Sequence, residues 1–212
     1  MKRGMFIVLE GIDGAGTTTQ INYLHDHIKS LSKYNDVLTT HEPWKSEEIK
    51  RKLREDKDSY SDGLEMVKLY VEDRELHSNN LINPNVNKGV YVISDRYNLS
   101  TYAYQMTQGV SFDEIDKIHM NHCIFTPDVT FYLDVDFITA RDRINKRGES
   151  LEKFEKDKDF VNKLIDNYRL IVRKYDNIRN KSRFGIIETI DGTKSIDEVA
   201  ENISTSLNKI II

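Results

Sequence analysis

The sequence is poor in cysteine, in proline and in long apolar runs. Its one cysteine, Cys123, excludes an intramolecular disulfide and fits a reducing compartment, so we expect a cytoplasmic protein. The chain has three prolines and no proline-rich linker, so its 212 residues are expected to form a single domain, 1–212. The apolar run Met5–Leu9 ends at Glu10, too early for a signal-peptide core, and no run approaches a membrane span. We therefore expect no membrane partner.

Charge is abundant but nearly balanced. Charged residues make up 31% of the chain, and the formal net charge is −4, so neither nucleic acid nor an anionic membrane is an expected partner. A polyanionic ligand would have to be bound by a local group of residues. The hydrophobic content of 38% is enough for a substantial core in one α/β domain.

Short apolar segments alternate with segments of helical periodicity. Five segments are predicted to be strands, and most of them are continuous apolar runs, as expected for strands buried on both faces: Met5–Leu9, Val37–Thr40, Val90–Ile93, Val129–Leu133 and Ile186–Ile190. Apolar residues recur at three- and four-residue spacing over 21–31, 64–71, 160–175 and 199–207. The alternation predicts an α/β fold, with a five-stranded parallel sheet flanked by helices on both faces.

The starts of three predicted helices carry the residue spacing of a capping box. In this arrangement the first side chain bonds a backbone N–H three residues on, and a carboxylate there bonds back. The three pairs are Asp62 with Glu65, Ser111 with Glu114, and Ser195 with Glu198.

A glycine-rich loop follows the first predicted strand and precedes the first predicted helix. It matches the phosphate-loop pattern G-x-x-x-x-G-K-[ST] at Gly11, Gly16 and Thr18, but Thr17 replaces the lysine. Backbone N–H groups and the positive helix end would surround a polyphosphate, and Thr18 would ligate Mg²⁺. Without a cation, the loop alone fits a phosphate site and an ordinary strand–helix turn equally well. The predicted phosphate-binding residues are Gly11, Ile12, Asp13, Gly14, Ala15, Gly16, Thr17, Thr18 and Thr19.

The residues from Glu10 to Gln20 resemble the phosphate loop of thymidylate kinases, in which an aspartate faces the sugar of the nucleoside monophosphate. Asp13 occupies that position. Further matches follow in the family's order over nearly the whole chain: Glu42-Pro43, Asp73-Arg74, Asp95-Arg96-Tyr97, Ala103-Tyr104-Gln105, Pro127-Asp128, Tyr132 to Val135, Arg143 to Gly148, and Asp191-Gly192-Thr193.

The resemblance implies a P-loop nucleoside monophosphate kinase fold and a Mg²⁺-dependent transfer of phosphoryl from ATP to dTMP, giving dTDP and ADP. It also implies a homodimer, for which the apolar faces around Leu64 to Leu81 and Ile115 to Ile118 are candidates. A buried core would show the same apolar pattern.

The resemblance assigns the acceptor phosphate to residues after the third strand, where open α/β sheets bind ligands. Arg96 would hold the phosphate with two parallel hydrogen bonds. Asp95 would act through Mg²⁺ or hold Arg96, and a structural ion pair is the alternative role. The implied catalytic residues are Asp13, Asp95, Arg96 and Arg147, and the implied metal ligands are Thr18 and Asp95.

The pyrimidine base is assigned to a helix face. Tyr70 and Arg74 are four residues apart, so Tyr70 would stack on the base while Arg74 donates to its O4. Thr101, with Ser100 beside it, would contact the base edge, and Tyr104 would press on the sugar where a 2′-hydroxyl would clash. A core position is the alternative for each aromatic side chain. The implied substrate-binding residues are Asp13, Glu42, Tyr70, Arg74, Arg96, Ser100, Thr101, Tyr104 and Gln105.

The turn at Glu42-Pro43 would lie beside the acceptor, and either Lys45 or Arg51 would reach the phosphate. His77 receives no role, because a histidine on this helix is as readily a cap or a solvent-facing residue.

The segment 145–158 is nearly devoid of apolar side chains and carries both charge signs, which is typical of a mobile surface segment. It resembles the family's lid, which closes over ATP. Arg143 would lie near the adenine, and Arg147 is the first candidate for a lid cation, with Lys146 and Lys153 as others. We hypothesise that Arg147 or a neighbour replaces part of the missing loop lysine.

Two other functions stay open. One is a related nucleoside or nucleoside monophosphate kinase with another base preference. The other is a nucleotide-binding protein whose catalysis is weak or lost because Thr17 replaces the lysine. Retention of Asp13, Asp95, Arg96 and a basic lid argues against the second.

Overall fold

A parallel β-sheet forms the centre of the computed structural model, which describes residues 3–56, 58–148, 154, 156–175 and 182–211. The five strands in this part of the chain lie in the order β2-β3-β1-β4-β5, with every pair parallel. Their bounds agree closely with the predicted segments: β1 (Phe6–Glu10), β2 (Val37–His41), β3 (Tyr91–Asp95), β4 (Val129–Asp134) and β5 (Ile186–Asp191). The predicted α/β fold is confirmed.

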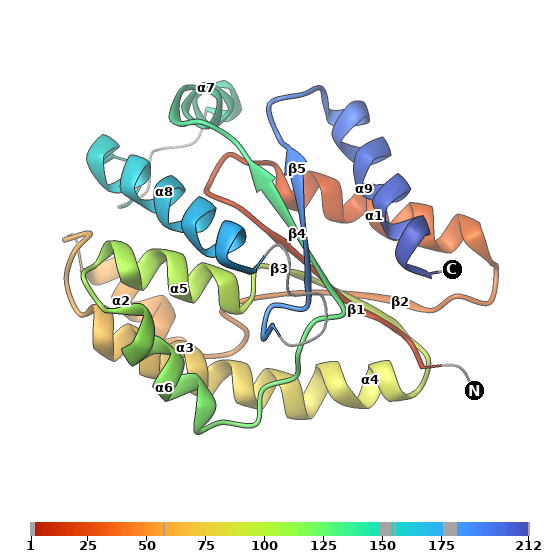
Figure 1. Cartoon of the computed structure of the whole chain (residues 1–212), viewed down its shortest axis with the longest axis horizontal. Coiled ribbons are helices and arrows are strands. Elements are labelled where there is room, and N and C mark those ends of the chain that lie inside the picture. Colours follow the sequence, from red (N-terminus) through yellow and green to blue (C-terminus); the bar gives the residue numbers. More distant parts are fainter. Residues whose placement is uncertain (1–2, 57, 149–153, 155, 176–181, 212) are drawn as a thin grey trace.

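Helices cover both faces of the sheet (Figure 1). The α1 and α9 helices pack against each other on one side, whereas α5 packs against α8 and α3 on the other. A π-helical turn, η1 (Ser78–Ile82), joins α3 to α4. The bounds of the helices are α1 (Thr17–Leu31), α2 (Glu47–Glu55), α3 (Gly63–His77), α4 (Asn83–Asn87), α5 (Asn98–Thr107), α6 (Phe112–Met120), α7 (Phe137–Arg147), α8 (Lys158–Tyr175) and α9 (Ile196–Ile211).

Every residue of β1 is buried, which explains its continuous apolar run. Successive side chains of a strand point to opposite faces. Accordingly, Ile7 and Leu9 belong to one apolar cluster, while Phe6 and Val8 belong to another, with residues of η1 and α4. The central strand is thus held from both sides, and its carboxyl end presents the glycine-rich loop.

Two of the three predicted capping boxes are confirmed. Ser111 and Glu114 bond each other's backbone N–H at the start of α6, and the same reciprocal bonds join Ser195 to Glu198 before α9. The prediction for Asp62 was wrong. Its backbone is left-handed, with φ of 54°, and its side chain caps nothing. The carboxylate instead lies 2.9 Å from Nζ of Lys52, so ion pairing replaces capping.

The predicted lid segment, 145–158, is described only in part. Its first residues complete α7, with Lys146 and Arg147 exposed in the last turn and Gly148 ending the helix. Lys158 begins α8. The remaining candidate cation, Lys153, lies outside the described residues.

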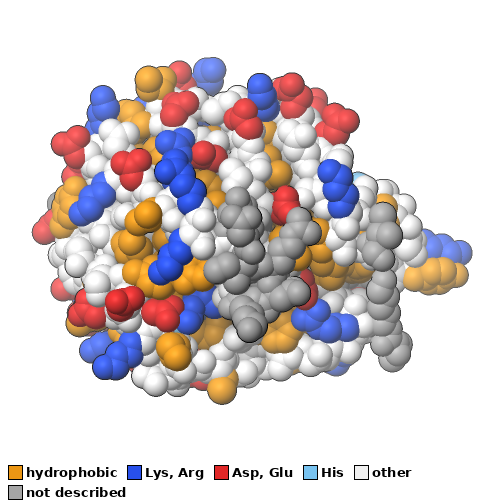
Figure 2. Space-filling view, viewed as in Figure 1, with side chains coloured by type: hydrophobic (Ala, Val, Ile, Leu, Met, Phe, Trp, Pro, Cys, Tyr) orange, Lys and Arg blue, Asp and Glu red, His pale blue; other side chains and the backbone are white. Residues whose placement is uncertain are grey.

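Basic and acidic side chains are interspersed over the face shown in Figure 2. No field of one sign dominates this face, in agreement with the small net charge. Within the residues that the structure describes, no helix combines the length and the apolar character needed to cross a bilayer.

Candidate active site

The glycine-rich loop turns between β1 and α1 with two left-handed glycines. Gly14 and Gly16 have φ of 86° and 97°, a region that side-chain-bearing residues rarely adopt. A Cβ on Gly14 would also come within 2.6 Å of the carbonyl oxygen of Ala140. Ile12 and Ala15 bury their side chains in the core, so they offer a ligand their backbone alone. The loop ends where α1 begins, which is the geometry of an anion site.

Thr17, which stands at the position of the usual lysine, is the first residue of α1 and is buried. The loop therefore has no cationic side chain. The next residue, Thr18, is exposed, and its Oγ1 donates a hydrogen bond of 2.8 Å to Oδ2 of Asp95. The second carboxylate oxygen of Asp95 is buried and has no hydrogen-bond partner among the described residues. Asp95 therefore contacts Thr18, the other predicted metal ligand. The described side-chain partners of Arg96 are Asp13 and Ser100, not Asp95.

Arg96 joins the end of β3 to the glycine-rich loop. Its Nη2 forms an ion pair with Asp13, and its Nη1 donates to Oγ of Ser100 over 3.3 Å. The guanidinium also lies 5.5 Å from the ring centroid of Tyr104, whose hydroxyl donates to Asp13 over 3.2 Å. Arg96 has a φ of 64°, a costly conformation for a non-glycine residue that is typical of functional sites. The glycine-rich loop and the first turns of α5, which are distant in sequence, thus meet at one cation.

Glu10 holds the turn that carries Arg96. Its carboxylate accepts from the backbone N–H groups of Tyr97 at 2.8 Å and Ser100 at 3.1 Å, and from Oγ of Ser100 at 2.5 Å. Burial raises the pKa of Glu10 above its ordinary value. The sequence interpretation assigned no role to Glu10, although a carboxylate at the end of a buried strand is itself an unusual signal.

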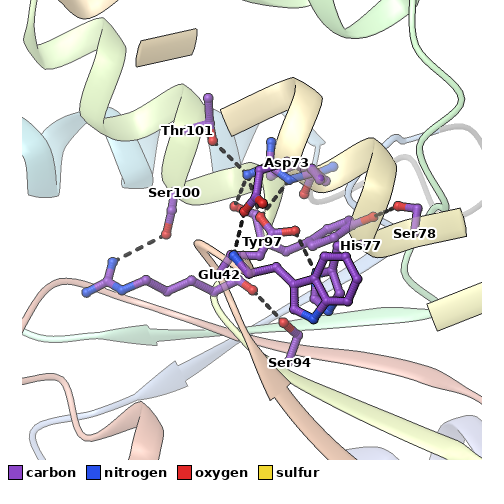
Figure 3. Close-up of polar contacts among 12 residues, drawn as sticks. Glu42, Asp73, His77, Ser78, Ser94, Tyr97, Ser100 and Thr101 are labelled. Atoms are coloured by element: carbon purple, nitrogen blue, oxygen red, sulfur yellow. Dashed lines mark hydrogen bonds and ion pairs between the residues drawn. The ribbon is translucent and has the colours of Figure 1, made fainter. Parts of the chain in front are cut away.

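Arg74 is the most enclosed cation of the site, with 1% of its surface exposed. Its Nε donates to Oε2 of Glu42 at 2.8 Å, and its Nη2 donates to Oγ1 of Thr101 at 2.8 Å and to the carbonyl of Tyr97 at 3.1 Å. Its Nη1 lies 3.1 Å from Nε2 of His119. The predicted neighbours Arg74 and Thr101 are therefore in direct contact, and Glu42 reaches them from the end of β2 (Figure 3).

The turn after Glu42 is fixed by the buried carboxylate of Asp73, which belongs to a matched motif but received no role from the sequence. Asp73 accepts from the backbone N–H groups of three successive residues, 44 to 46, at 2.5 to 3.0 Å. His77 lies 3.1 Å from Oε1 of Glu42 and 2.9 Å from Oγ1 of Thr40. The expectation that His77 caps a helix or faces solvent was wrong, because its ring is fully buried and holds Glu42 in place (Figure 3).

One cavity is lined by all the side chains that the resemblance assigned to substrate binding. Its lining combines aromatic side chains with a few charged and polar groups, as is common in small-molecule sites. Burial raises the pKa of Tyr70 to about 12, so its phenol stays protonated. The lining includes Asp13, Glu42, Tyr70, Arg74, Arg96, Ser100, Thr101, Tyr104 and Gln105.

The cation that α2 brings to this cavity is Lys52, and neither sequence candidate is part of the described lining. Nζ of Lys45 lies over the ring of Trp44, 4.1 Å from its centroid. Arg51 pairs with Glu48 and Glu55 on the exposed face of α2. Because residues 51 and 52 are about 100° apart on a helix, only one of them faces the cavity. The lining thus includes a cation that the sequence analysis did not offer, and the expectation that Lys45 or Arg51 reaches the phosphate stays a prediction.

Arg143 of α7 ties the glycine-rich loop to the turn after β5. Its guanidinium donates to the carbonyl of Ala15 at 3.3 Å and to that of Lys194 at 3.2 Å. Arg141, on the same helix, borders a small apolar hollow beside Asp13. Among the described residues, no three His, Cys, Asp or Glu side chains cluster to hold a metal unaided.

Comparison with known proteins agrees with this geometry. The family model described as thymidylate kinase matches residues 9–203. A probable thymidylate kinase of Staphylothermus marinus is 34% identical over 206 residues, covering 94% of this chain and 92% of the relative. The thymidylate kinase of Desulfotalea psychrophila is 34% identical over 212 residues, covering 98% and 96%. The crystal structure of a thymidylate kinase from Ehrlichia chaffeensis superposes with a TM-score of 0.71 at 26% identity, covering 97% of this chain and 99% of that one. The chain therefore belongs to the thymidylate kinase family.

Proposed function

We propose that the protein transfers the terminal phosphoryl group of ATP to dTMP, giving ADP and dTDP. The observation that supports this most is the single cavity that runs from the Asp13–Arg96 pair to the buried Arg74–Thr101 pair. A nucleoside monophosphate has its phosphate at one end and its base at the other. The lining offers one cation for each part, Arg96 beside Asp13 of the glycine-rich loop and Arg74 beside Thr101.

The acceptor phosphate belongs beside Arg96 in this proposal. A planar guanidinium matches phosphate oxygens with two parallel hydrogen bonds. Asp13 and Ser100 hold Arg96 in place before the substrate arrives. Lys52 also lines the cavity, where it pairs with Asp62.

The base belongs beside Arg74, Tyr70 and Gln105. An arginine only donates hydrogen bonds, so Arg74 selects a base with an acceptor such as O4 of thymine. Oε1 of Gln105 is buried without a partner among the described residues, and it would accept from N3–H of the same base. Tyr70 supplies an aromatic face beside them, and Tyr104 stands at the sugar.

The residues fit a magnesium ion as the metal of the reaction. Thr18 and Asp95 place a hydroxyl and a carboxylate together, and the second oxygen of Asp95 is buried without a partner among the described residues. Mg²⁺ is usually bound by one or two protein oxygens and by substrate phosphates. When bound there, it would neutralise charge on the phosphates of ATP.

The transfer forms a bond from a phosphate oxygen of dTMP to the γ-phosphorus and breaks the bond to the bridging oxygen of ADP. Such transfers depend on positioning and on charge stabilisation. In this chain, backbone N–H groups of the loop and the start of α1 receive the donor phosphates, and Arg96 aligns the acceptor. Because Thr17 supplies no charge, we expect slower turnover than in a lysine-bearing loop.

An ADP-release assay with a panel of nucleoside monophosphates tests the proposal. Release with dTMP, and little release with dCMP, dGMP or AMP, supports it. Release that is fastest with another monophosphate would favour a different base preference. Tight dTMP binding without ADP release would show that the loop has lost catalysis. The relatives named above favour the first result.

A homodimer is part of the proposal. Leu64 and Leu76 of α3 and Met120 of α6 are 44%, 56% and 72% exposed, and the two helices that carry them are in contact. Ile115 is fully buried in the protein's own core, which is the alternative that the sequence left open for this position. Leu76→Glu should yield a monomer by light scattering, whereas Ile138→Glu, a substitution at a similarly exposed position on α7, should leave the mass unchanged.

A cytoplasmic location is also proposed. The support is the single free and exposed thiol of Cys123, which suits a reducing compartment. Subcellular fractionation of the source cells, followed by detection of the protein in each fraction, would test it.

A further inference from the structure

His119 lies outside all the motifs that resemble thymidylate kinases, yet it contacts the most enclosed cation of the site. It belongs to α6, is 4% exposed, and its Nε2 lies 3.1 Å from Nη1 of Arg74. We propose that His119 is a positioning residue that aims Arg74 at the 4-oxo group of a pyrimidine, so that the site prefers thymine over a 4-amino pyrimidine. This inference rests on the proposed function.

The hydrogen bonds of His119 fix its tautomer. Nδ1 lies 2.9 Å from the backbone carbonyl oxygen of Ile115, which can only accept, so the ring proton is on Nδ1. Nε2 then carries the lone pair that accepts from Arg74. Burial and the charge of Arg74 lower the pKa of His119 to about 3, so the ring is neutral at neutral pH. The ring of Tyr102, with its centroid 4.8 Å away, packs against the imidazole.

A guanidinium has five N–H bonds, and the partners of Arg74 account for most of them. Nε donates to Glu42, and Nη2 donates to Thr101 and Tyr97 and lies 2.6 Å from the same oxygen of Glu42. One N–H of Nη1 faces His119, which leaves the other N–H of Nη1 without a partner among the described residues. Arg74 lines the cavity, so this remaining N–H is the one available to a ligand. His119 holds the nitrogen that carries it.

The fixed N–H of Arg74 discriminates between pyrimidines because they differ at position 4. Position 4 of thymine bears an oxygen that accepts a hydrogen bond, whereas position 4 of cytosine bears an amino group that donates. A buried donor that faces another donor leaves both unpaired, so a fixed N–H rejects the wrong base more strongly than a mobile one. If Nη1 were free to turn, the same arginine would still supply charge but would discriminate less.

Two substitutions separate the contacts of His119. Asparagine is short, so His119→Asn keeps a polar group near the Ile115 carbonyl and loses the reach to Arg74. Glutamine is longer, so His119→Gln places an amide oxygen near the position of Nε2. The measurements are dTMP and dCMP affinity by titration calorimetry, and the KM values for dTMP and ATP.

We expect His119→Asn to weaken dTMP binding about tenfold, as the loss of one charge-assisted hydrogen bond implies. It should narrow the preference for dTMP over dCMP and leave the KM for ATP unchanged. His119→Gln should keep most of the affinity and most of the preference. Full recovery of the preference by glutamine would be the clearest support.

Equal behaviour of the two variants, or an equal loss for dTMP, dCMP and ATP, would overturn the inference in favour of a purely structural histidine. If His119→Asn fails to fold, the dTMP-to-dCMP ratio of His119→Gln decides: a retained ratio supports the role, and a lost ratio overturns it. The unsubstituted protein separates failure of this inference from failure of the proposed function. If it neither binds nor phosphorylates dTMP, the proposed function itself is overturned.

Discussion

The hydroxyl of Thr18 donates a hydrogen bond of 2.8 Å to the carboxylate of Asp95, across 77 positions of sequence. Thr18 stands in the first turn of α1, and Asp95 ends β3. The contact arises because β3 lies directly beside β1, so the segments that follow the two parallel strands meet at one edge of the sheet. Two hard oxygen groups are thereby joined beside the phosphate loop.

This pair leads to a prediction on magnesium. Thr18→Val and Asp95→Asn should each raise the Mg²⁺ concentration needed for half-maximal activity, by roughly ten- to a hundredfold if one strong polar contact of about 1.5 to 3 kcal/mol is lost. Thr18→Ser keeps the hydroxyl and serves as the control. Magnesium titrations of ADP release provide the measurement. An unchanged Mg²⁺ dependence in Thr18→Val would rule out this role for the pair.

A second prediction concerns the cation that α2 brings to the cavity. Lys52 lines the cavity and pairs there with Asp62 and Glu65. If it turns to the acceptor phosphate when dTMP binds, Lys52→Ala should raise the KM for dTMP about tenfold. Lys45→Ala and Arg51→Ala are matched controls, since neither residue is part of the described lining. Steady-state kinetics of the three variants test the assignment. A larger effect from Arg51→Ala than from Lys52→Ala would contradict it.

The missing lysine gives a third prediction. Thr17→Lys should speed turnover by roughly ten- to a hundredfold, the value of a charge-assisted hydrogen bond. Arg147→Ala should slow the unsubstituted protein and affect the Thr17→Lys variant less, if Arg147 replaces part of the lysine. A double-mutant cycle in kcat measures the coupling. If Arg147→Ala leaves the rate unchanged and Thr17→Lys raises nothing, the compensation hypothesis fails.

The buried histidine predicts a pH dependence of stability. The pKa of His119 is about 3 in the folded protein, below its ordinary value of 6.5. Between these values the unfolded chain binds the proton and the folded protein does not, so stability falls as the pH falls below 6.5. At pH 5 the loss from this group is about 2 kcal/mol, from 1.36 kcal/mol per pH unit.

Denaturant unfolding at pH 7 and pH 5 checks this dependence. His119→Gln should lose less stability than the unsubstituted protein over that interval, because glutamine does not titrate. His25→Gln, at a histidine that pairs with Asp26 on the surface, is the control. Parallel pH curves for His119→Gln and the unsubstituted protein would contradict the prediction.

Much of the fold could be predicted from local patterns. The strands β1, β3 and β4 are buried on both faces, so their apolar runs identify them without any tertiary information. The caps at Ser111 and Ser195 are local hydrogen bonds and were predicted correctly. The cap at Asp62 was not, because Lys52, ten positions earlier in the chain, competes for its carboxylate.

The same difference between local patterns and tertiary contacts applies to the candidate site. Its candidate residues could be chosen from motifs, but Lys52 was not among them, because several charged residues neighbour one another on α2. Residue spacing alone does not say which helical face meets a cavity. Glu10, Asp73, His77 and His119 received no role from the sequence, because they act through other side chains or through backbone N–H groups. No motif reports such contacts.

The sequence by itself determined the succession of strands and helices along the chain, the position of the glycine-rich loop and the family of the protein. All of these depend on short-range patterns. The tertiary structure alone decided which charges meet. Arg74 is held by groups from the end of β2, from the turn and helix that follow β3, and from α6, and Asp95 finds Thr18 across a strand pair. Those contacts exist because the parallel sheet brings the carboxyl ends of its strands to one edge, where distant segments must share a small space.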